Sequence, residues 1–334
     1  MKNFAFLEPA SVAAAVELLH ADPGRSRLIA GGSDLLGELK EGTAYYEKLV
    51  SLRRIAALQS VVPQTAAAHG RAGLRLGAGV TLTQLEHEPR LTGPYRILAE
   101  AARGVATPEI RNQGTLGGNL CQRPRCLHFR SPWIPCAKKG GAGCPAAASS
   151  HQPYLSVFGG AACSSVHASD LAPPLLALGA SAVIAGTQGE RTLPLAGFFA
   201  GPEVDVRKEN ILSADEILTA VLLPEPPPAW RGTFLKARER TAGDFPLVSV
   251  AFGCRLEQGR LRDVRLVLGG VAPVPRLCPE VEAALEQQAP SRETATRAAE
   301  LAFARATPLP SNAWKVELGR ALLVRAIEQM GAPA

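Results

Sequence analysis

The spacing of apolar positions predicts alternating helices and strands in the N-terminal part of the chain. Ser11 is a typical N-cap, and the apolar residues that follow recur at helical spacing, so a helix is expected directly after it. Short apolar runs predict strands at 28–30 and within 48–55. A later strand precedes a helix in which Thr83 and Glu86 are spaced as a capping box. This order indicates a small βαβ lobe that leads into a larger one.

The pattern changes after a proline-rich stretch, "PEPPPAW". Beyond it, apolar and polar residues alternate in two runs on either side of the turn "EQGR", which is typical of an antiparallel hairpin. Two helical periodicities follow, at 291–306 and 312–330. We therefore expect three units: a first lobe at 1–56, a second lobe at 57–225 and an α+β domain at 226–334.

Composition sets limits on partners and location. The chain has 334 residues, which is long for one compact core, and 46% of them are hydrophobic, as in ordinary globular proteins. The formal net charge of +6 favours an anionic ligand or an acidic partner subunit. Because the basic residues are scattered and only 5% of residues are aromatic, no nucleic acid is expected. No apolar run approaches the ~18 residues of a membrane-spanning helix, so no membrane insertion is expected.

The N-terminus lacks the continuous apolar region of a signal peptide, because Glu8 and Pro9 interrupt it. The sequence by itself predicts a cytoplasmic chain, whereas export together with a signal-bearing partner would place it in the periplasm. Seven cysteines in a cytoplasmic chain favour free thiols or metal ligands over a disulfide framework.

Two glycine turns carry the first candidate chemistry. Gly31 and Gly32 follow the strand predicted at 28–30, where they let backbone N–H groups approach an anion, and Ser33 adds a hydroxyl. The pattern suits a phosphate cradle, but it has neither the Rossmann nor the Walker spacing, and an ordinary tight turn is the alternative. A second turn combines a glycine pair with polar side chains: Thr115, Gly117, Gly118 and Asn119. Together, the two turns indicate a ligand with two phosphates, or with one phosphate and a polar chain.

Five stretches occur in the order and rough spacing of one known family. They are "IAGGSDLLGELK", "TPEIRNQGTLGGNLC", "SDLAPPLLALGA", "EILTAVLLPEP" and "KARERTAGDFPLVSVA". In these stretches the chain resembles the FAD-binding subunit of the molybdenum hydroxylases, which include xanthine dehydrogenase, carbon monoxide dehydrogenase, 4-hydroxybenzoyl-CoA reductase and bacterial aldehyde oxidoreductases. The resemblance implies an α+β fold, with a two-lobed FAD-binding domain of the vanillyl-alcohol-oxidase type and a C-terminal α+β domain that contains an antiparallel sheet.

The resemblance also implies where FAD would bind. The pyrophosphate would be wrapped by the first turn, that is by Ala30, Gly31, Gly32, Ser33, Asp34 and Leu35. Phosphate and ribitol contacts would come from Thr115, Gly117, Gly118 and Asn119. Asp170 matches an acidic residue beside the ribityl chain, Leu218 a residue against the flavin ring, and Lys236 a lysine near the pyrimidine edge. Without the resemblance, Asp170 would be a helix cap and Lys236 part of a solvated charge run.

A long insertion with four cysteines lies between the second glycine turn and Asp170. It occupies about 122–168, and 48 residues separate Cys121 from Asp170 where family members without an insertion have only a few. A segment of this length without periodicity is unusual in a compact domain unless it is functional or held by a staple. Four thiolates could ligate a 4Fe-4S cluster or a structural zinc ion, and the spacing alone favours neither; free buried thiols are the third possibility. The cysteines of the insertion are Cys126, Cys136, Cys144 and Cys163.

The resemblance favours the 4Fe-4S cluster. The insertion is similar to the cluster loop in the flavin subunits of 4-hydroxybenzoyl-CoA reductase and of the aldehyde oxidoreductases, which implies Cys126, Cys136, Cys144 and Cys163 as ligands. Cys121 matches a cysteine of relatives without the insertion and is expected to be a turn or core thiol. Cys254 and Cys278 are expected to be buried thiols, and none of the histidines in the insertion is expected to be a ligand.

The function implied is an electron-transfer subunit of a heterotrimeric molybdenum-dependent aldehyde oxidoreductase. A large molybdopterin-binding subunit would oxidise the substrate, and a small 2Fe-2S subunit would pass electrons to FAD in this chain, from which they would reach an external electron acceptor. A subunit like that of 4-hydroxybenzoyl-CoA reductase or xanthine dehydrogenase is the alternative within the family. Outside it, the alternatives are a stand-alone FAD oxidase and a zinc-stapled binding protein. No histidine lies between His20 and His69, which argues against a covalently attached flavin.

Overall fold

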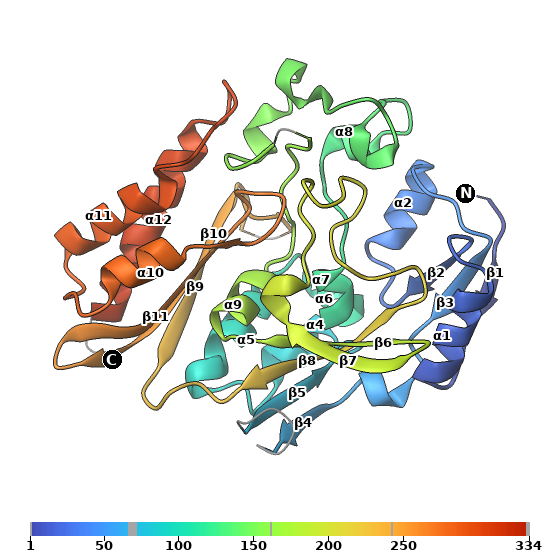
Figure 1. The fold of residues 1–334 in the computed structure, drawn as a ribbon, viewed down its shortest axis with the longest axis horizontal. Coiled ribbons are helices and arrows are strands. Elements are labelled where there is room, and N and C mark those ends of the chain that lie inside the picture. The colour runs from blue at the N-terminus through green and yellow to red at the C-terminus, as the bar shows by residue number, and fades with distance from the viewer. Residues whose placement is uncertain (1, 66–71, 161, 242, 332–334) are drawn as a thin grey trace.

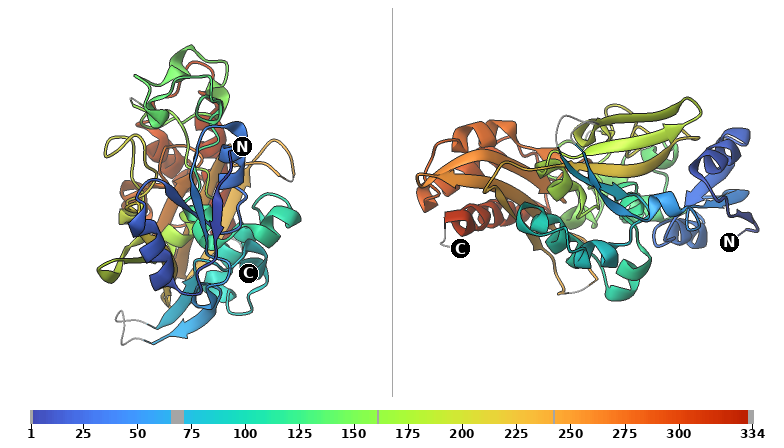
Figure 2. Two further views of the ribbon diagram at one scale, coloured as in Figure 1. Left: turned by 90° about the vertical axis from the view of Figure 1, so that its right-hand side faces the viewer. Right: turned by 90° about the horizontal axis from the view of Figure 1, so that it is seen from below.

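Three sheets follow one another along the chain in the computed structural model, which describes residues 2–65, 72–160, 162–241 and 243–331. The N-terminal lobe and the C-terminal domain lie at opposite ends of the molecule, with a five-stranded sheet between them (Figures 1 and 2). This arrangement confirms the predicted α+β architecture. None of the helices in the described part of the chain is both long and apolar enough to cross a membrane.

The N-terminal lobe is a parallel three-stranded sheet, in the order β1-β3-β2, with two helices. Its elements are β1 (Ala5–Leu7), α1 (Val12–Ala21), β2 (Ser26–Ile29), α2 (Leu35–Glu41) and β3 (Lys48–Ser51). The predicted cap of α1 is confirmed, because the Ser11 hydroxyl accepts a hydrogen bond from the Ala14 N–H at 3.1 Å. The buried face of α1 packs against Ala185 and Ile217 of the central sheet, which joins the two lobes.

The central sheet is antiparallel, in the order β4-β5-β8-β6-β7. Its strands are β4 (Val61–Gln64), β5 (Gly73–Gly77), β6 (Ser181–Gly186), β7 (Gly189–Pro194) and β8 (Ile217–Pro224). The helices of this region are α4 (Leu82–His87), α5 (Arg96–Arg103), α6 (Pro108–Gln113), α7 (Leu116–Leu120) and α9 (Ala172–Ala177). All of them except α6 contribute buried residues to the largest apolar core of the molecule, which they share with the inner strands.

The capping box of α4 lies two residues earlier than predicted. The Thr81 hydroxyl accepts from the Gln84 N–H at 3.1 Å, and the Gln84 side chain accepts from the Thr81 N–H at 2.8 Å. Thr83 instead donates to the Asn112 side chain, and Glu86 pairs with Arg111 at 3.0 Å. The prediction was wrong because the helix starts two residues sooner, at Leu82.

The C-terminal domain confirms the predicted hairpin and helices. Strands β10 and β11 pair antiparallel around the turn, where Gln258 and Gly259 both have positive φ. The sheet order is β12-β11-β10-β9, and three helices pack with it around a separate apolar core. The elements are β9 (Arg231–Ala237), β10 (Val248–Glu257), β11 (Arg260–Gly269), β12 (Arg276–Leu277), α10 (Pro279–Leu285), α11 (Arg292–Phe303) and α12 (Trp314–Gly331).

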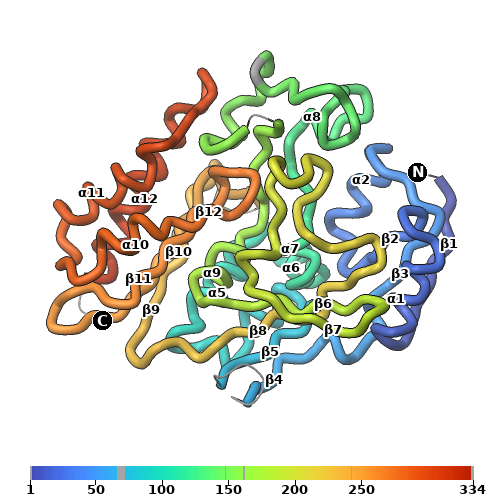
Figure 3. Tube along the Cα trace, viewed as in Figure 1, coloured from blue at the N-terminus to red at the C-terminus, as the bar shows by residue number. Residues whose placement is uncertain are grey.

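The segment 122–168, which we call the cysteine segment, has little regular structure. It contains the single turn of α8 (Leu127–Arg130) and short 3-10 turns, and it stands apart from the sheets, between α2 and the C-terminal helices (Figures 1 and 3). Its later part is anchored in the C-terminal domain: Val157 and Phe158 join that domain's core, and the Asn312 amide donates to the carbonyl oxygens of Leu155 and Ser156 at 3.2 and 3.1 Å. The cysteine segment is thus held by the rest of the molecule and not by a core of its own.

Candidate functional site

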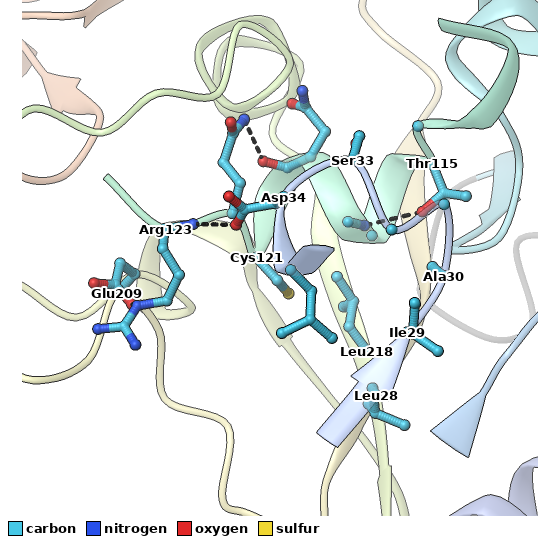
Figure 4. A pocket seen from close by; sticks show the side chains of 18 of the residues that line it. Leu28, Ile29, Ala30, Ser33, Asp34, Thr115, Cys121, Arg123, Glu209 and Leu218 are labelled. Carbon is cyan, nitrogen blue, oxygen red and sulfur yellow. Dashed lines mark hydrogen bonds and ion pairs between the residues drawn. The ribbon is translucent and has the colours of Figure 1, made fainter. Parts of the chain in front are cut away.

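A cavity of about 720 Å³ opens between the N-terminal lobe, α7 and β8, a size typical of ligand sites (Figure 4). Of the residues predicted to bind a cofactor, all except Lys236 line it: Ala30, Gly31, Gly32, Ser33, Asp34, Leu35, Thr115, Gly117, Gly118, Asn119, Asp170 and Leu218. These residues come from separate parts of the chain, so the fold gathers them into one wall.

The first glycine turn offers unbonded N–H groups to this cavity. Gly32 has φ of +74°, which reverses the chain between β2 and α2. The N–H groups of Gly32, Ser33 and Asp34 find no acceptor among the described residues. Successive free amides at the start of a helix form an anion-binding concavity. The turn therefore has the chemistry of a phosphate site.

The two glycine turns touch each other. A Cβ atom on Gly31 would lie 1.9 Å from the carbonyl oxygen of Gln113, at the end of α6, so no side chain fits at this position. Similarly, a Cβ atom on Gly117 would lie 2.8 Å from the Ala78 Cβ. Glycine at both positions thus allows backbone to pack on backbone at the floor of the cavity.

The second turn uses its own N–H groups for folding. The Leu116 and Gly117 N–H groups donate to the carbonyl oxygens of Val80 and Ala78, both at 2.8 Å. The Gly118 N–H donates to the Thr115 hydroxyl at 3.1 Å. This turn presents side chains and a smooth glycine surface to the cavity, and few free amides.

Asp170 and Lys236 form a buried ion pair. The Lys236 Nζ lies 2.6 Å from Asp170 Oδ2 and also donates to the Gly104 carbonyl oxygen at 3.1 Å. Both side chains are almost fully buried, and burial raises the pKa of the Asp170 carboxyl while Lys236 opposes that rise. Asp170 Oδ1 has no hydrogen-bond partner among the described residues. It lies in the cavity wall as an open acceptor for a ligand hydroxyl.

The simpler interpretations of these two residues are wrong. Asp170 does not cap α9, because the Ser169 hydroxyl accepts the Ala172 N–H at 3.0 Å in that role. Lys236 is not solvated, since it lies behind Asp170. The Ser169 hydroxyl also donates to Asn119 Oδ1 at 2.5 Å, which ties α7 to the start of α9.

Asp34 links the first turn to the cysteine segment. Its Oδ2 accepts from the Arg123 N–H at 2.8 Å (Figure 4). Its Oδ1 lies 2.9 Å from Arg125 Nη1 and 2.5 Å from Arg130 Nη2. On its other side, Arg123 pairs with Glu209 at 2.9 Å, and Lys138 reaches the same carboxylate at 2.7 Å. These contacts could not be predicted from local patterns, because the partners of Asp34 are distant along the chain.

The remaining wall is apolar. Leu28, Ile29 and Leu218 face the space beside Cys121, as Figure 4 shows. Cys121 had been expected to be a turn or core thiol, and burial raises its pKa to about 12. This shift disfavours the thiolate form, in agreement with a turn or core thiol. Cys254 and Cys278 are fully buried thiols, as predicted.

Three of the four cysteines in the insertion precede short helical turns: Cys126, Cys136 and Cys144 occupy the N-cap positions. Burial raises the pKa of Cys126, while the N–H groups of Phe129 and His128 act against that rise, as the Lys138 N–H does at Cys136. Negative charge on Cys136 or Cys163 adds to the rise in the pKa of Cys126. Negative charge on Cys163 or Cys144 likewise adds to the rise in the pKa of Cys136. The four sulfurs are therefore electrostatic neighbours.

No compact metal site is formed by these thiols. Within the described ranges, no group of three or more His, Cys, Asp or Glu side chains is placed to hold a metal ion. This holds for a zinc ion and for a 4Fe-4S cluster alike, so the arrangement of the thiols favours neither metal.

Comparison with known proteins follows the division seen in the fold. Residues 2–226 match the FAD binding domain in molybdopterin dehydrogenase, and residues 233–330 match the CO dehydrogenase flavoprotein C-terminal domain. The chain is 30% identical to the aldehyde oxidoreductase FAD-binding subunit PaoB of Escherichia coli K12, over 100% of both chains. It is also 30% identical to the putative xanthine dehydrogenase FAD-binding subunit XdhB of the same organism, over 82% of this chain and 76% of that one.

Solved structures show the same architecture. The chain aligns with quinoline 2-oxidoreductase from Pseudomonas putida 86 with a TM-score of 0.77 and 26% identity, covering 99% of this chain and 98% of that one. Reconstituted CO dehydrogenase from Oligotropha carboxidovorans gives a TM-score of 0.78 at 23% identity, covering 100% and 99%. The cavity, its free amides and these matches agree: the chain is an oxidoreductase subunit that belongs to the FAD-binding subunits of the molybdopterin dehydrogenase family, the molybdenum hydroxylases.

Proposed function

We propose that the chain is the FAD- and 4Fe-4S-containing electron-transfer subunit of a heterotrimeric molybdenum-dependent aldehyde oxidoreductase. The observation that carries this proposal is that the cavity and the cysteine segment meet at the first glycine turn. The free amides of the first glycine turn face a ligand-sized cavity, and the cysteine segment is attached to the same turn through Asp34. The full-length similarity to an aldehyde oxidoreductase subunit supports the substrate class.

The residues of the cavity fit FAD. The Gly32, Ser33 and Asp34 amides would hold the diphosphate, and the second turn would frame phosphate and ribitol through Thr115, Gly117, Gly118 and Asn119. The first turn as a whole, Ala30 to Leu35, would follow the pyrophosphate. When bound, flavin supplies a centre that accepts electrons singly and releases them in pairs.

The polar and apolar walls would orient the other end of the cofactor. The open Oδ1 of Asp170 would accept a hydrogen bond from a ribityl hydroxyl. Leu218 would pack against the flavin ring and exclude water from one face. Lys236 would act from behind Asp170, where it keeps that carboxylate charged and fixed, and its positive charge would lie near the pyrimidine edge.

We propose a 4Fe-4S cluster in the cysteine segment in place of a set of free thiols. Its ligands would be Cys126, Cys136, Cys144 and Cys163, as the resemblance of the segment to the cluster loop of related flavin subunits implies. Backbone N–H groups at the short turns would stabilise the thiolates at Cys126 and Cys136. The segment carries no carboxylate between 122 and 168, so its basic residues would offset the negative charge of a cluster.

The proposed partners are a large molybdopterin-binding subunit and a small 2Fe-2S subunit. The first would oxidise the aldehyde, and the second would deliver the electrons that this chain passes to an external acceptor. The alternative within the family is an enzyme like xanthine dehydrogenase or 4-hydroxybenzoyl-CoA reductase. Of these two, the similarity to XdhB favours the xanthine dehydrogenase-like enzyme. We propose domain limits of 1–56, 57–225 and 226–334.

Visible spectroscopy with metal analysis of the purified complex tests the proposal. We expect flavin bands, a broad iron-sulfur shoulder that bleaches with dithionite, and iron in the isolated chain. Cys163→Ser should remove the 4Fe-4S signal, because it deletes a ligand, while Cys121→Ser should leave the iron content unchanged. A colourless chain that contains zinc, or turnover by this chain in the absence of any molybdenum subunit, would contradict the proposal.

A further inference from the structure

Arg125 lies in the wall of the cavity although it belongs to the cysteine segment. Its Nη1 is 2.9 Å from Asp34 Oδ1 in the first glycine turn. Its guanidinium also stacks on Phe245, 4.8 Å from the ring centroid, and Phe245 lines the cavity from the loop between β9 and β10. Arg125 thus bridges two walls of the cavity that belong to different domains.

The guanidinium of Arg125 has donors to spare. Besides the contact with Asp34, Nη2 donates to Gln122 Oε1 at 3.1 Å. The Nε atom is buried and has no partner among the described residues. Because an arginine carries five N–H groups, this side chain has more donors than the protein accepts. An unsatisfied buried donor in a cavity wall points to a ligand acceptor.

The neighbouring arginines are held elsewhere. Arg130 contacts the same Oδ1 of Asp34 at 2.5 Å, is 9% exposed, and donates to the Pro124 carbonyl oxygen at 2.9 Å. Arg123 pairs with Glu209 at 2.9 Å. Arg125 therefore shares Asp34 Oδ1 with Arg130, which lies closer to that oxygen. It is the one that can turn a donor toward an added anion without leaving a carboxylate unpaired.

We propose that Arg125 of the cysteine segment binds the diphosphate of FAD. This inference rests on the proposed function, since it requires FAD in the cavity. The arginine lies beside the turn whose amides are free, and its planar fork suits phosphate oxygens. Asp34 would otherwise repel a diphosphate in this turn, and the guanidinium groups of Arg125 and Arg130 neutralise it. The cysteine segment thereby contributes to the flavin site as well as to a cluster.

The test compares affinities for FAD and for riboflavin, which has no phosphate. The full chain in its complex is freed of flavin, and binding is followed by flavin fluorescence for wild type, Arg125→Gln and Arg125→Lys. We expect Arg125→Gln to weaken FAD binding roughly 10- to 100-fold, the range of a charge-assisted hydrogen bond, and to leave riboflavin binding within about threefold. Arg125→Lys should recover part of the loss, and the salt dependence of FAD binding should decrease in Arg125→Gln.

Arg297→Gln is the matched control, because Arg297 is an exposed arginine of α11, paired at 3.7 Å with Glu293. It should change neither affinity. Two results would overturn the inference: FAD affinity in Arg125→Gln within threefold of wild type, or an equal loss for riboflavin and FAD, which would show a general disturbance of the cavity. A wild-type chain that binds no FAD would overturn the proposed function instead, whatever the variants do.

Discussion

The two glycine turns look alike in the sequence and differ in their hydrogen bonds. In the first turn, the N–H groups of Gly32 to Asp34 have no acceptor among the described residues. In the second, the N–H groups of Leu116 to Gly118 are bonded to Val80, Ala78 and Thr115. A glycine pair therefore indicates a close approach of the backbone, but whether it binds an anion depends on which amides remain free.

This difference assigns separate tasks to the turns. We expect the first to hold the diphosphate, and its own side chain Asp34 is paired with two arginines of the cysteine segment. The second forms the floor, where its amides stabilise the junction of α7 with the loop after β5. Substitutions at the two turns should accordingly affect different properties.

The largest effect is expected for Gly31→Ala. The added Cβ would overlap the Gln113 carbonyl oxygen, so the first turn must move away from the floor. We expect FAD affinity to fall roughly 100-fold, equivalent to about 3 kcal/mol. Titration of the flavin-free protein with FAD measures this affinity.

Gly117→Ala is the matched variant, since its Cβ would crowd Ala78. It should lower the free energy of unfolding by about 2 kcal/mol and FAD affinity by less than tenfold. Equal losses of affinity in both variants would contradict the division of tasks.

A smaller effect is expected in amide hydrogen exchange on FAD removal. With FAD bound, the amide hydrogens of Gly32, Ser33 and Asp34 should exchange at least roughly tenfold more slowly than without it, because only then do these amides have acceptors. The amides of Leu116 and Gly117 should be protected in both states, as they are already bonded within the protein. Mass spectrometry of the two turns with and without FAD decides this. Protection that appears at the second turn alone would reverse the assignment.

The smallest effect is expected for Thr115→Ala. This change removes the hydroxyl that accepts the Gly118 N–H at the start of α7. A lost N-cap costs about 1 kcal/mol, so a small decrease in unfolding free energy should be seen in chemical denaturation. Thr115→Ser, which keeps the hydroxyl, should remain close to wild type. A loss of unfolding free energy well above about 2 kcal/mol would mean that Thr115 contributes more to the fold than the cap of α7.

Local signals predicted much of the fold. The Ser11 cap, the hairpin at "EQGR" and the last two helices depend on neighbours a few residues away, and the structure confirms each. The capping box failed for a definite reason. Two residue pairs fit the capping-box pattern, Thr81 with Gln84 and Thr83 with Glu86. The first pair forms the box, because the turn after β5 ends where α4 must start at Leu82.

Contacts between distant charges could not be predicted. Asp170 and Lys236 were singled out separately, and their pairing joins residues 66 positions apart. Asp34 and Arg130 are 96 positions apart, and no spacing in the sequence relates them. A charge run looks solvated until tertiary packing removes the water around it, so Lys236 and the arginines of the cysteine segment had no local signal.

The place of β8 in the central sheet sets an order on synthesis. This strand lies between β5 and β6, and its Leu218 closes one wall of the cavity, yet it is the last strand of the sheet to be made. All cysteines of the cysteine segment are therefore synthesised before the central sheet can be completed. The pairing of β5 with β8 joins residues that are more than a hundred positions apart. We therefore expect FAD to bind only after β8 has been synthesised and has joined the sheet.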